Sequence, residues 1–94
     1  MASSVIGVKV SYDEVADVLY LTLRRCEDSL GEQNDEGIVV FHDAQTGEVM
    51  GLLILDFWAR FVHDGKVDED ALARVLDAPF TGFIPDMRDA VLPA

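Results

Sequence analysis

Long hydrophobic runs, cysteines and basic residues are all scarce in this 94-residue chain. No apolar run reaches the roughly eighteen residues that a transmembrane helix needs, so we expect no membrane span. The first residues show no basic segment followed by an apolar one, which predicts no secretory signal. The single cysteine, Cys26, cannot form an intramolecular disulfide, as is typical of proteins from a reducing compartment. We therefore expect a cytoplasmic protein.

Basic residues number seven against eighteen acidic ones, and the formal net charge is −11. A surface this negative repels phosphate backbones and anionic lipids, so we expect no nucleic-acid partner and no membrane partner. Half of the residues are hydrophobic, which excludes intrinsic disorder. The length predicts one domain, residues 1–94, with a single core.

The first part of the chain, residues 8–56, has the pattern of two β-hairpins. Four segments are predicted to be strands, namely 8–12, 18–24, 38–43 and 48–55. In the second segment, Leu19 and Leu21 alternate with Tyr20 and Thr22, so its two faces differ. The last segment is apolar on both faces, which is typical of a central strand.

Between the two hairpins, residues 26–37 change to a polar and acidic composition without periodicity, which predicts a solvated loop. Its acidic part, residues 27–36, has two interpretations. It is either a solubilising connection or a patch that attracts a basic protein partner and raises its association rate.

Residues 57–77 are predicted to form two short helices, because the apolar period changes after Asp56. We expect Asp56 to be the N-cap of the first helix and Gly65 to end it. Asp68 is the predicted N-cap of the second helix. The buried stripe of that second helix would consist of Leu72, Val75 and Leu76.

The last segment, residues 78–94, contains all three prolines, which predicts an irregular tail. It also carries six large apolar residues that should pack on the domain: Phe80, Phe83, Ile84, Met87, Val91 and Leu92. The predicted fold class is therefore α+β. We expect a four-stranded, mainly antiparallel sheet, two short helices and an irregular apolar C-terminal tail.

The predicted strands carry apolar residues on both faces, whereas two short helices can cover one face only. Either the tail or a second copy of the chain must then cover the other face. We therefore expect a homodimer, with the tail contributing to its interface.

The segment 12–21 reads Tyr-Asp-Glu-Val-Ala-Asp-Val-Leu-Tyr-Leu, a strand, a turn and a strand. This motif resembles the opening of DUF2283, a bacterial family with no established activity. Segments similar to the family's later parts are 37–41, 43–47 and 51–56. The resemblance extends over about residues 8–56 and implies the fold and a cytosolic setting. Leu53 stands where that family usually has a glutamate.

The motif also has two physical interpretations. In the structural one, Tyr12 and Tyr20 form a cross-strand pair, while Asp13 and Asp17 accept hydrogen bonds from the turn amides. In the functional one, Asp13 and Asp17 belong to a divalent-cation site or an active site. His42 and Asp43 are the further candidates for that site.

Other reactive side chains give weaker patterns. Cys26 could be a nucleophile with His42 as its base, although no third orienting residue is indicated. His63 is expected near the C-terminus of the first helix, where it would interact favourably with the helix dipole. No glycine-rich phosphate loop is present, and no cofactor is predicted.

Two functions follow as hypotheses. The first is a small, non-enzymatic cytosolic protein that self-associates and acts through protein–protein contacts, as a regulatory or antitoxin-like partner of a basic protein. The alternative is an enzyme or divalent-cation-binding module that uses Asp13, Asp17, His42 and Asp43.

Overall fold

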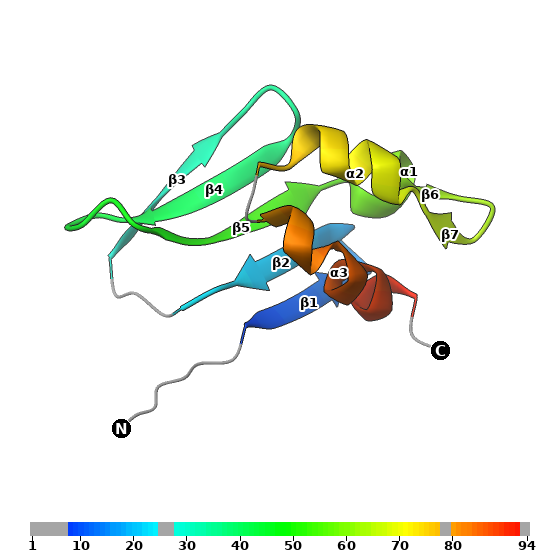
Figure 1. Cartoon of the computed structure of the whole chain (residues 1–94), viewed down its shortest axis with the longest axis horizontal. Coiled ribbons are helices and arrows are strands. Elements are labelled where there is room, and N and C mark those ends of the chain that lie inside the picture. Colours follow the sequence, from blue (N-terminus) through cyan, green and yellow to red (C-terminus); the bar gives the residue numbers. More distant parts are fainter. Residues whose placement is uncertain (1–7, 25–27, 78–79, 93–94) are drawn as a thin grey trace.

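The computed structural model describes residues 8–24, 28–77 and 80–92 and has an α+β fold. Its main feature is a five-stranded antiparallel sheet with the strand order β1-β2-β5-β4-β3 (Figure 1). The strands are β1 (Lys9–Asp13), β2 (Val18–Thr22), β3 (Ser29–Gln33), β4 (Ile38–Asp43) and β5 (Val49–Leu55). The other elements are α1 (Phe57–Phe61), β6 (Val62–His63), β7 (Lys66–Val67), α2 (Glu69–Val75), the 3-10 helix η1 (Phe80–Phe83) and α3 (Ile84–Val91).

The central strand is β5, which pairs antiparallel with β2 on one side and with β4 on the other. This central position explains why the residues of β5 are apolar on both faces of the sheet. The predicted strands of both hairpins are present, with ends that differ by one or two residues from the expected ones.

The strand β3 is a correction to the prediction, because it lies within the segment 26–37 that was expected to be a loop. All five of its residues are exposed, so no burial period marks it in the sequence. Its order comes from antiparallel pairing with β4, in which Gly31 lies opposite Phe41. The predicted sheet of four strands therefore gains a fifth at its edge.

The first helix is shorter than predicted. It ends at Phe61, and the chain continues into a small hairpin, β6–β7, rather than stopping at Gly65. Asp64 and Gly65 form the tip of this hairpin with φ angles of 55° and 73°, the conformation that a tight two-residue hairpin turn requires. His63 therefore lies on β6, and its Nε2 is 3.8 Å from Asp68 Oδ2.

The second helix agrees with the prediction. The Asp68 side chain accepts a hydrogen bond from the Ala71 amide at 3.0 Å, which makes it the N-cap of α2. Leu72 and Leu76 are buried and Val75 is partly buried.

The segment after residue 80 is helical, not irregular as predicted. Pro85 lies in the first turn of α3, where a missing amide hydrogen costs nothing because that amide has no partner in the helix. The expectation that this segment packs is confirmed: Phe80, Ile84, Met87 and Val91 are all buried in the core.

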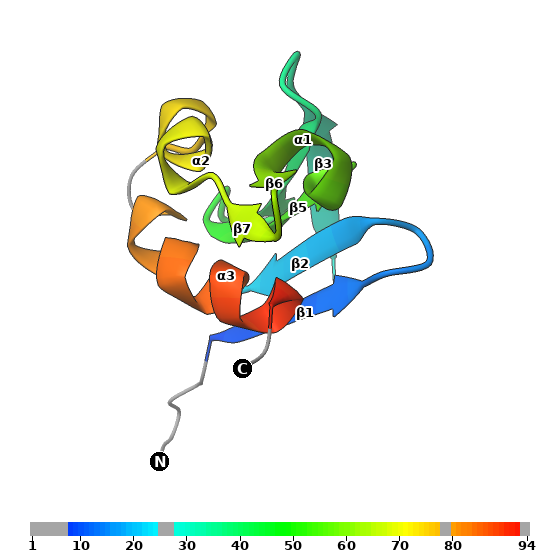
Figure 2. The ribbon, with the colours of Figure 1, turned by 90° about the vertical axis from the view of Figure 1, so that its right-hand side faces the viewer.

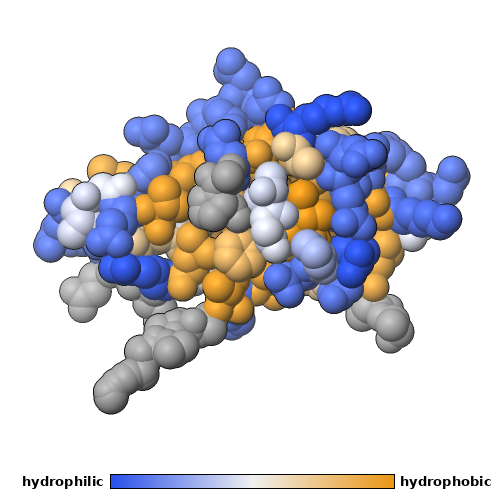
Figure 3. All heavy atoms as spheres, viewed as in Figure 1, coloured by the Kyte–Doolittle hydropathy of each residue, from blue (hydrophilic) through white to orange (hydrophobic). Residues whose placement is uncertain are grey.

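The main core cluster lies on one face of the sheet, although Val18 is buried on the other. α3 contacts β1 and β2, and α2 contacts α1 and α3. Figure 2 shows α2 and α3 on the same side of the sheet. Figure 3 shows hydrophilic residues over the projecting turns and hydrophobic residues across the middle of the molecule.

Candidate functional site

The four residues predicted for a cation or active site fall into two separate pairs. Asp13 is the last residue of β1 and Asp17 lies in the turn that follows, near the end of β5 at Leu55. His42 and Asp43 lie at the end of β4, beside the other end of β5. The seven residues of β5 span about 20 Å. Among the described residues, no group of three or more His, Cys, Asp or Glu side chains could hold a metal ion.

The Asp17 side chain binds the start of α1 and the Tyr12 hydroxyl, and these contacts explain much of the turn motif. Its Oδ1 accepts hydrogen bonds from the Trp58 amide and the Tyr12 hydroxyl, both at 2.7 Å, and its Oδ2 accepts one from the Ala59 amide at 3.2 Å. The Phe57 amide donates to the Asp17 carbonyl oxygen. Asp17 therefore caps α1 across 41 positions in sequence.

The predicted cap, Asp56, precedes α1 as expected but makes no side-chain hydrogen bond to it. It has a φ angle of 54° and a left-handed conformation. The carboxylate that satisfies the free amides of α1 comes instead from the first hairpin, which ties that hairpin to the helical layer.

These contacts set the protonation of Asp17 and Tyr12. Burial alone would raise the pKa of the Asp17 carboxyl, but hydrogen bonds from the Trp58 amide, the Tyr12 hydroxyl and the Ala59 amide lower it overall. Burial, together with the bond to the charged Asp17, raises the pKa of Tyr12 to about 12. The pair is thus held as a phenol and a carboxylate at neutral pH.

The other candidate residues have local roles. Asp13 Oδ1 accepts hydrogen bonds from the Val15 and Ala16 amides, as expected for a residue that brackets the turn. The Nδ1 atom of His42 lies 3.3 Å from the Gly47 carbonyl oxygen. Cys26 lies outside the described residues, so its predicted pairing with His42 stays a prediction.

The predicted pair of Tyr12 and Tyr20 is wrong. Tyr12 lies opposite Leu19 and Tyr20 lies opposite Ser11. Tyr12 packs against the core, whereas Tyr20 lies on the other side of the sheet. The two tyrosines belong to consecutive cross-strand pairs, and the side chains of consecutive pairs point to opposite faces. Phe57, whose ring centroid is 6.3 Å away, is the aromatic neighbour of Tyr12.

The second face of the sheet, which we call the open face, carries no helix. Its position follows from the register: Leu19, Ile54 and Ile38 form a buried row of the core, so the adjacent row of Tyr20, Leu53 and Val39 points away from it. On the three central strands, the paired positions of this face are Val18, Tyr20, Thr22, Gly51, Leu53, Leu55, Val39 and Phe41.

None of these eight positions is charged, although the chain carries a net charge of −11. Charged residues in the open-face register occur on the edge strand β1, where Lys9 and Asp13 lie opposite Thr22 and Val18. The centre of the open face is therefore apolar, and charged side chains lie along its border.

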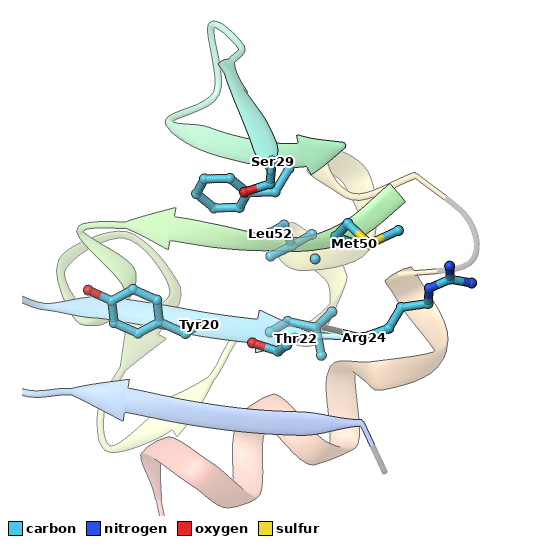
Figure 4. Close-up of a pocket in the computed structure, with 9 residues that line it drawn as sticks. Tyr20, Thr22, Arg24, Ser29, Met50 and Leu52 are labelled. Carbon is cyan, nitrogen blue, oxygen red and sulfur yellow. The ribbon is translucent and has the colours of Figure 1, made fainter. Parts of the chain in front are cut away.

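A hollow of about 300 Å³ lies on the open face above Gly51. Figure 4 shows Tyr20 and Thr22 extending from β2 beside it, with Met50 and Leu52 on β5 and Ser29 on β3. Gly51 forms part of its floor, and a Cβ there would collide with the Leu21 carbonyl oxygen. The aromatic ring of Phe41 lies along another wall.

The sequence alone does not predict this hollow. Phe41 and Gly51 meet only through the pairing of β4 with β5, whose register shifts between Phe41 and His42. A glycine in an apolar strand was the one available signal, because such a glycine often marks a close approach of two backbones.

Comparison with protein families, curated proteins and solved structures gives no match to this chain. Within the described ranges, no helix has the length and apolar character needed to cross a membrane.

Proposed function

We propose that this protein is a non-enzymatic interaction module that self-associates through the open face of its sheet. The observation that carries the proposal is the charge-free apolar centre of that face, which the chain's own helices leave uncovered. The expected contribution of the C-terminal segment is revised, because α3 packs on the opposite face, in the core.

The size of the open face supports a dimer of modest affinity. Five strands about 4.8 Å apart, each about 20 Å long, present a flat area of about 400 Å² per copy. Two copies would then bury about 800 Å² of flat area and somewhat more accessible surface, which is below the standard size of about 1,200–2,000 Å² and in the range of weak, transient interfaces. We therefore expect weak, concentration-dependent self-association.

Electrostatics separates self-association from binding of a basic partner. Two copies with a charge of −11 repel each other, and salt screens that repulsion, so added salt should strengthen the dimer. Attraction between this protein and a basic partner would weaken under the same change. The basic partner, of a regulatory or antitoxin-like kind, remains our second proposal, supported by the net charge alone.

The resemblance to DUF2283 bears on one residue of this face. Leu53, at the centre of the open face, occupies the position where that family usually has a glutamate. We therefore propose that self-association through this face is a property of this chain that a glutamate there would prevent.

Sedimentation velocity between about 10 μM and about 1 mM tests the proposal in the concentration range expected of a small interface. The wild-type protein should shift from 10.4 kDa toward twice that mass, and more so in higher salt. Leu53→Glu should stay monomeric, because it places a carboxylate in the apolar centre. Val15→Glu is the matched control, since it adds the same charge at a turn residue that is 95% exposed, and it should dimerise at high salt.

A wild-type protein that stays at 10.4 kDa at every concentration and salt would disprove self-association. A Leu53→Glu variant that dimerises as well as Val15→Glu would instead place the interface elsewhere on the molecule.

A further inference from the structure

We infer that the hollow above Gly51 is the docking site for the Tyr20 side chain of a second copy, and that two copies exchange this contact symmetrically. The inference rests on the proposed self-association and adds its central anchor. It names one projecting residue and one recess, both of which lie on the open face of every copy.

Tyr20 has the properties of such an anchor. Its side chain is 39% exposed although it lies on a strand next to the centre of the sheet. No hydrogen bond joins its hydroxyl to another described side chain. A tyrosine provides a large rigid apolar ring at small entropic cost, which is why tyrosines are common among the residues that dominate interface affinity.

The hollow fits the chemistry of a tyrosine. Phe41 supplies an apolar wall beside the floor at Gly51, and Thr22, Arg24 and Ser29 supply polar groups at its rim. A buried tyrosine needs an apolar surface for its ring and a hydrogen-bond partner for its hydroxyl. At about 300 Å³ the hollow is at the lower limit for small-molecule sites, so a single ring fills it better than a cofactor would.

Two features keep the hollow open within each chain. Gly51 has no side chain to fill it, and the Leu21 carbonyl oxygen leaves no room for one. Arg24, at the rim, pairs with Glu48 rather than with a residue of the hollow, with 3.0 Å between Nη1 and Oε2. The recess is therefore available to a side chain from outside.

A two-fold axis satisfies both contacts at once. Tyr20 and Thr22 lie on the same face of β2, about 7 Å apart along the strand. An axis in the plane of the interface that crosses β2 between them places each Tyr20 over the other copy's hollow. The two sheets then pack with nearly aligned strands, as in β-sandwiches.

Three variants test this contact by sedimentation and by native mass spectrometry. Tyr20→Ala removes the projecting ring and Thr22→Trp fills the recess from an exposed position. Each alone should weaken the dimer by at least about tenfold. Trp58→Ala is the matched control, because it removes an aromatic residue that is 44% exposed on the helical side, and its dimer should match the wild type. Thermal melting and circular dichroism establish that all variants are folded.

Mixing the two weakened variants provides the sharper test. A Tyr20→Ala copy retains its recess and a Thr22→Trp copy retains its tyrosine, so the mixed dimer keeps one of the two contacts. Native mass spectrometry should therefore show the heterodimer in excess over both homodimers. The two homodimers and the heterodimer in statistical proportion, or two variants that dimerise like the wild type, would overturn the inference.

These outcomes are distinct from failure of the proposed function. If the wild-type protein is monomeric throughout, self-association itself is wrong. If the wild type and the Tyr20→Ala variant dimerise equally well while Leu53→Glu does not, the open face is the interface and Tyr20 is not its anchor.

Discussion

The turns of the two hairpins have the same local design and different tertiary roles. In the first turn the Asp13 carboxylate accepts hydrogen bonds from the Val15 and Ala16 amides. In the second, the Asp43 carboxylate accepts hydrogen bonds from the Gln45 and Thr46 amides. Each turn ends, four residues after its aspartate, at a residue with positive φ.

That last residue is where the turns differ. Gly47 ends the second turn at a φ of 79°, with open space around it. Asp17 ends the first at a φ of 57°, a conformation that a residue with a Cβ adopts at some cost. This conformational cost is offset because the Asp17 carboxylate caps α1 and accepts a hydrogen bond from the Tyr12 hydroxyl. The last residue of the first turn attaches the sheet to a helix, whereas Gly47, with no side chain, makes no such attachment.

The largest expected effect comes from removing this attachment. Asp17→Ala loses three hydrogen bonds to a carboxylate and keeps a Cβ at positive φ, so we expect a loss of about 2–4 kcal/mol in the free energy of unfolding. Asp17→Gly gives the first turn the ending of the second and should lose about 1 kcal/mol less. Urea denaturation at one fixed protein concentration measures both. Equal stability of Asp17→Ala and wild type would contradict the capping role.

Acid should reproduce part of that loss. The pKa of Asp17 is lowered in the folded protein from its ordinary value of 3.8, so the folded state binds this proton less readily than the unfolded state. The stabilisation is present above about pH 4 and is lost as the pH falls through the lowered folded pKa. The difference in stability between wild type and Asp17→Asn should shrink over this range in urea denaturation. A difference independent of pH would show that the charge of Asp17 does not matter.

Tyr12→Phe tests the hydrogen bond from the Tyr12 hydroxyl to the Asp17 carboxylate. It removes one hydrogen bond to the carboxylate and keeps the ring beside Phe57, so we expect a loss of about 1–1.5 kcal/mol. Because the folded pKa of Tyr12 is about 12, against 10.0 for an ordinary tyrosine, its contribution is complete below pH 10.0 and is lost as the pH rises through 12. Titration of tyrosinate absorbance at alkaline pH should show one phenol fewer at high pKa in the variant.

The smallest effect is expected in the second turn. Gly47→Ala places a Cβ at a φ of 79° where nothing else is touched, so we expect a loss of about 1 kcal/mol from backbone strain alone. Its acid and alkaline profiles should match those of the wild type. A changed pH profile in this variant would show that the Gly47 backbone also affects a titrating group.

Several features of the fold could be predicted from the sequence because they depend on local periodicity. The alternation in 18–24 indicated which residues of β2 face the core, and Asp68 was identifiable as the cap of α2. The strand β3 could not be predicted in this way, because all of its residues are exposed and β4 alone orders it. The helix α3 was hidden by Pro85, which usually ends a helix but is tolerated in the first turn.

The candidate site shows the same division. The apolar character of both faces of the sheet was visible in the sequence, and it led to the expectation of self-association. The hollow above Gly51 was not visible, because it depends on the register between β4 and β5. The cation site suggested by Asp13, Asp17, His42 and Asp43 would need contacts that the sheet does not make, since the two pairs lie at opposite ends of β5.

The sequence by itself determined the α+β class, the strongly negative charge and the surplus of apolar residues, because composition and periodicity are local properties. Only the tertiary structure decided which face of the sheet stays uncovered. All three helices contribute buried residues to one core, and none covers the other face, on which Tyr20 is 39% exposed and Val18 is buried. The role of Asp17 was likewise decided by the tertiary structure, because its motif is local but the helix that it caps lies 41 positions away.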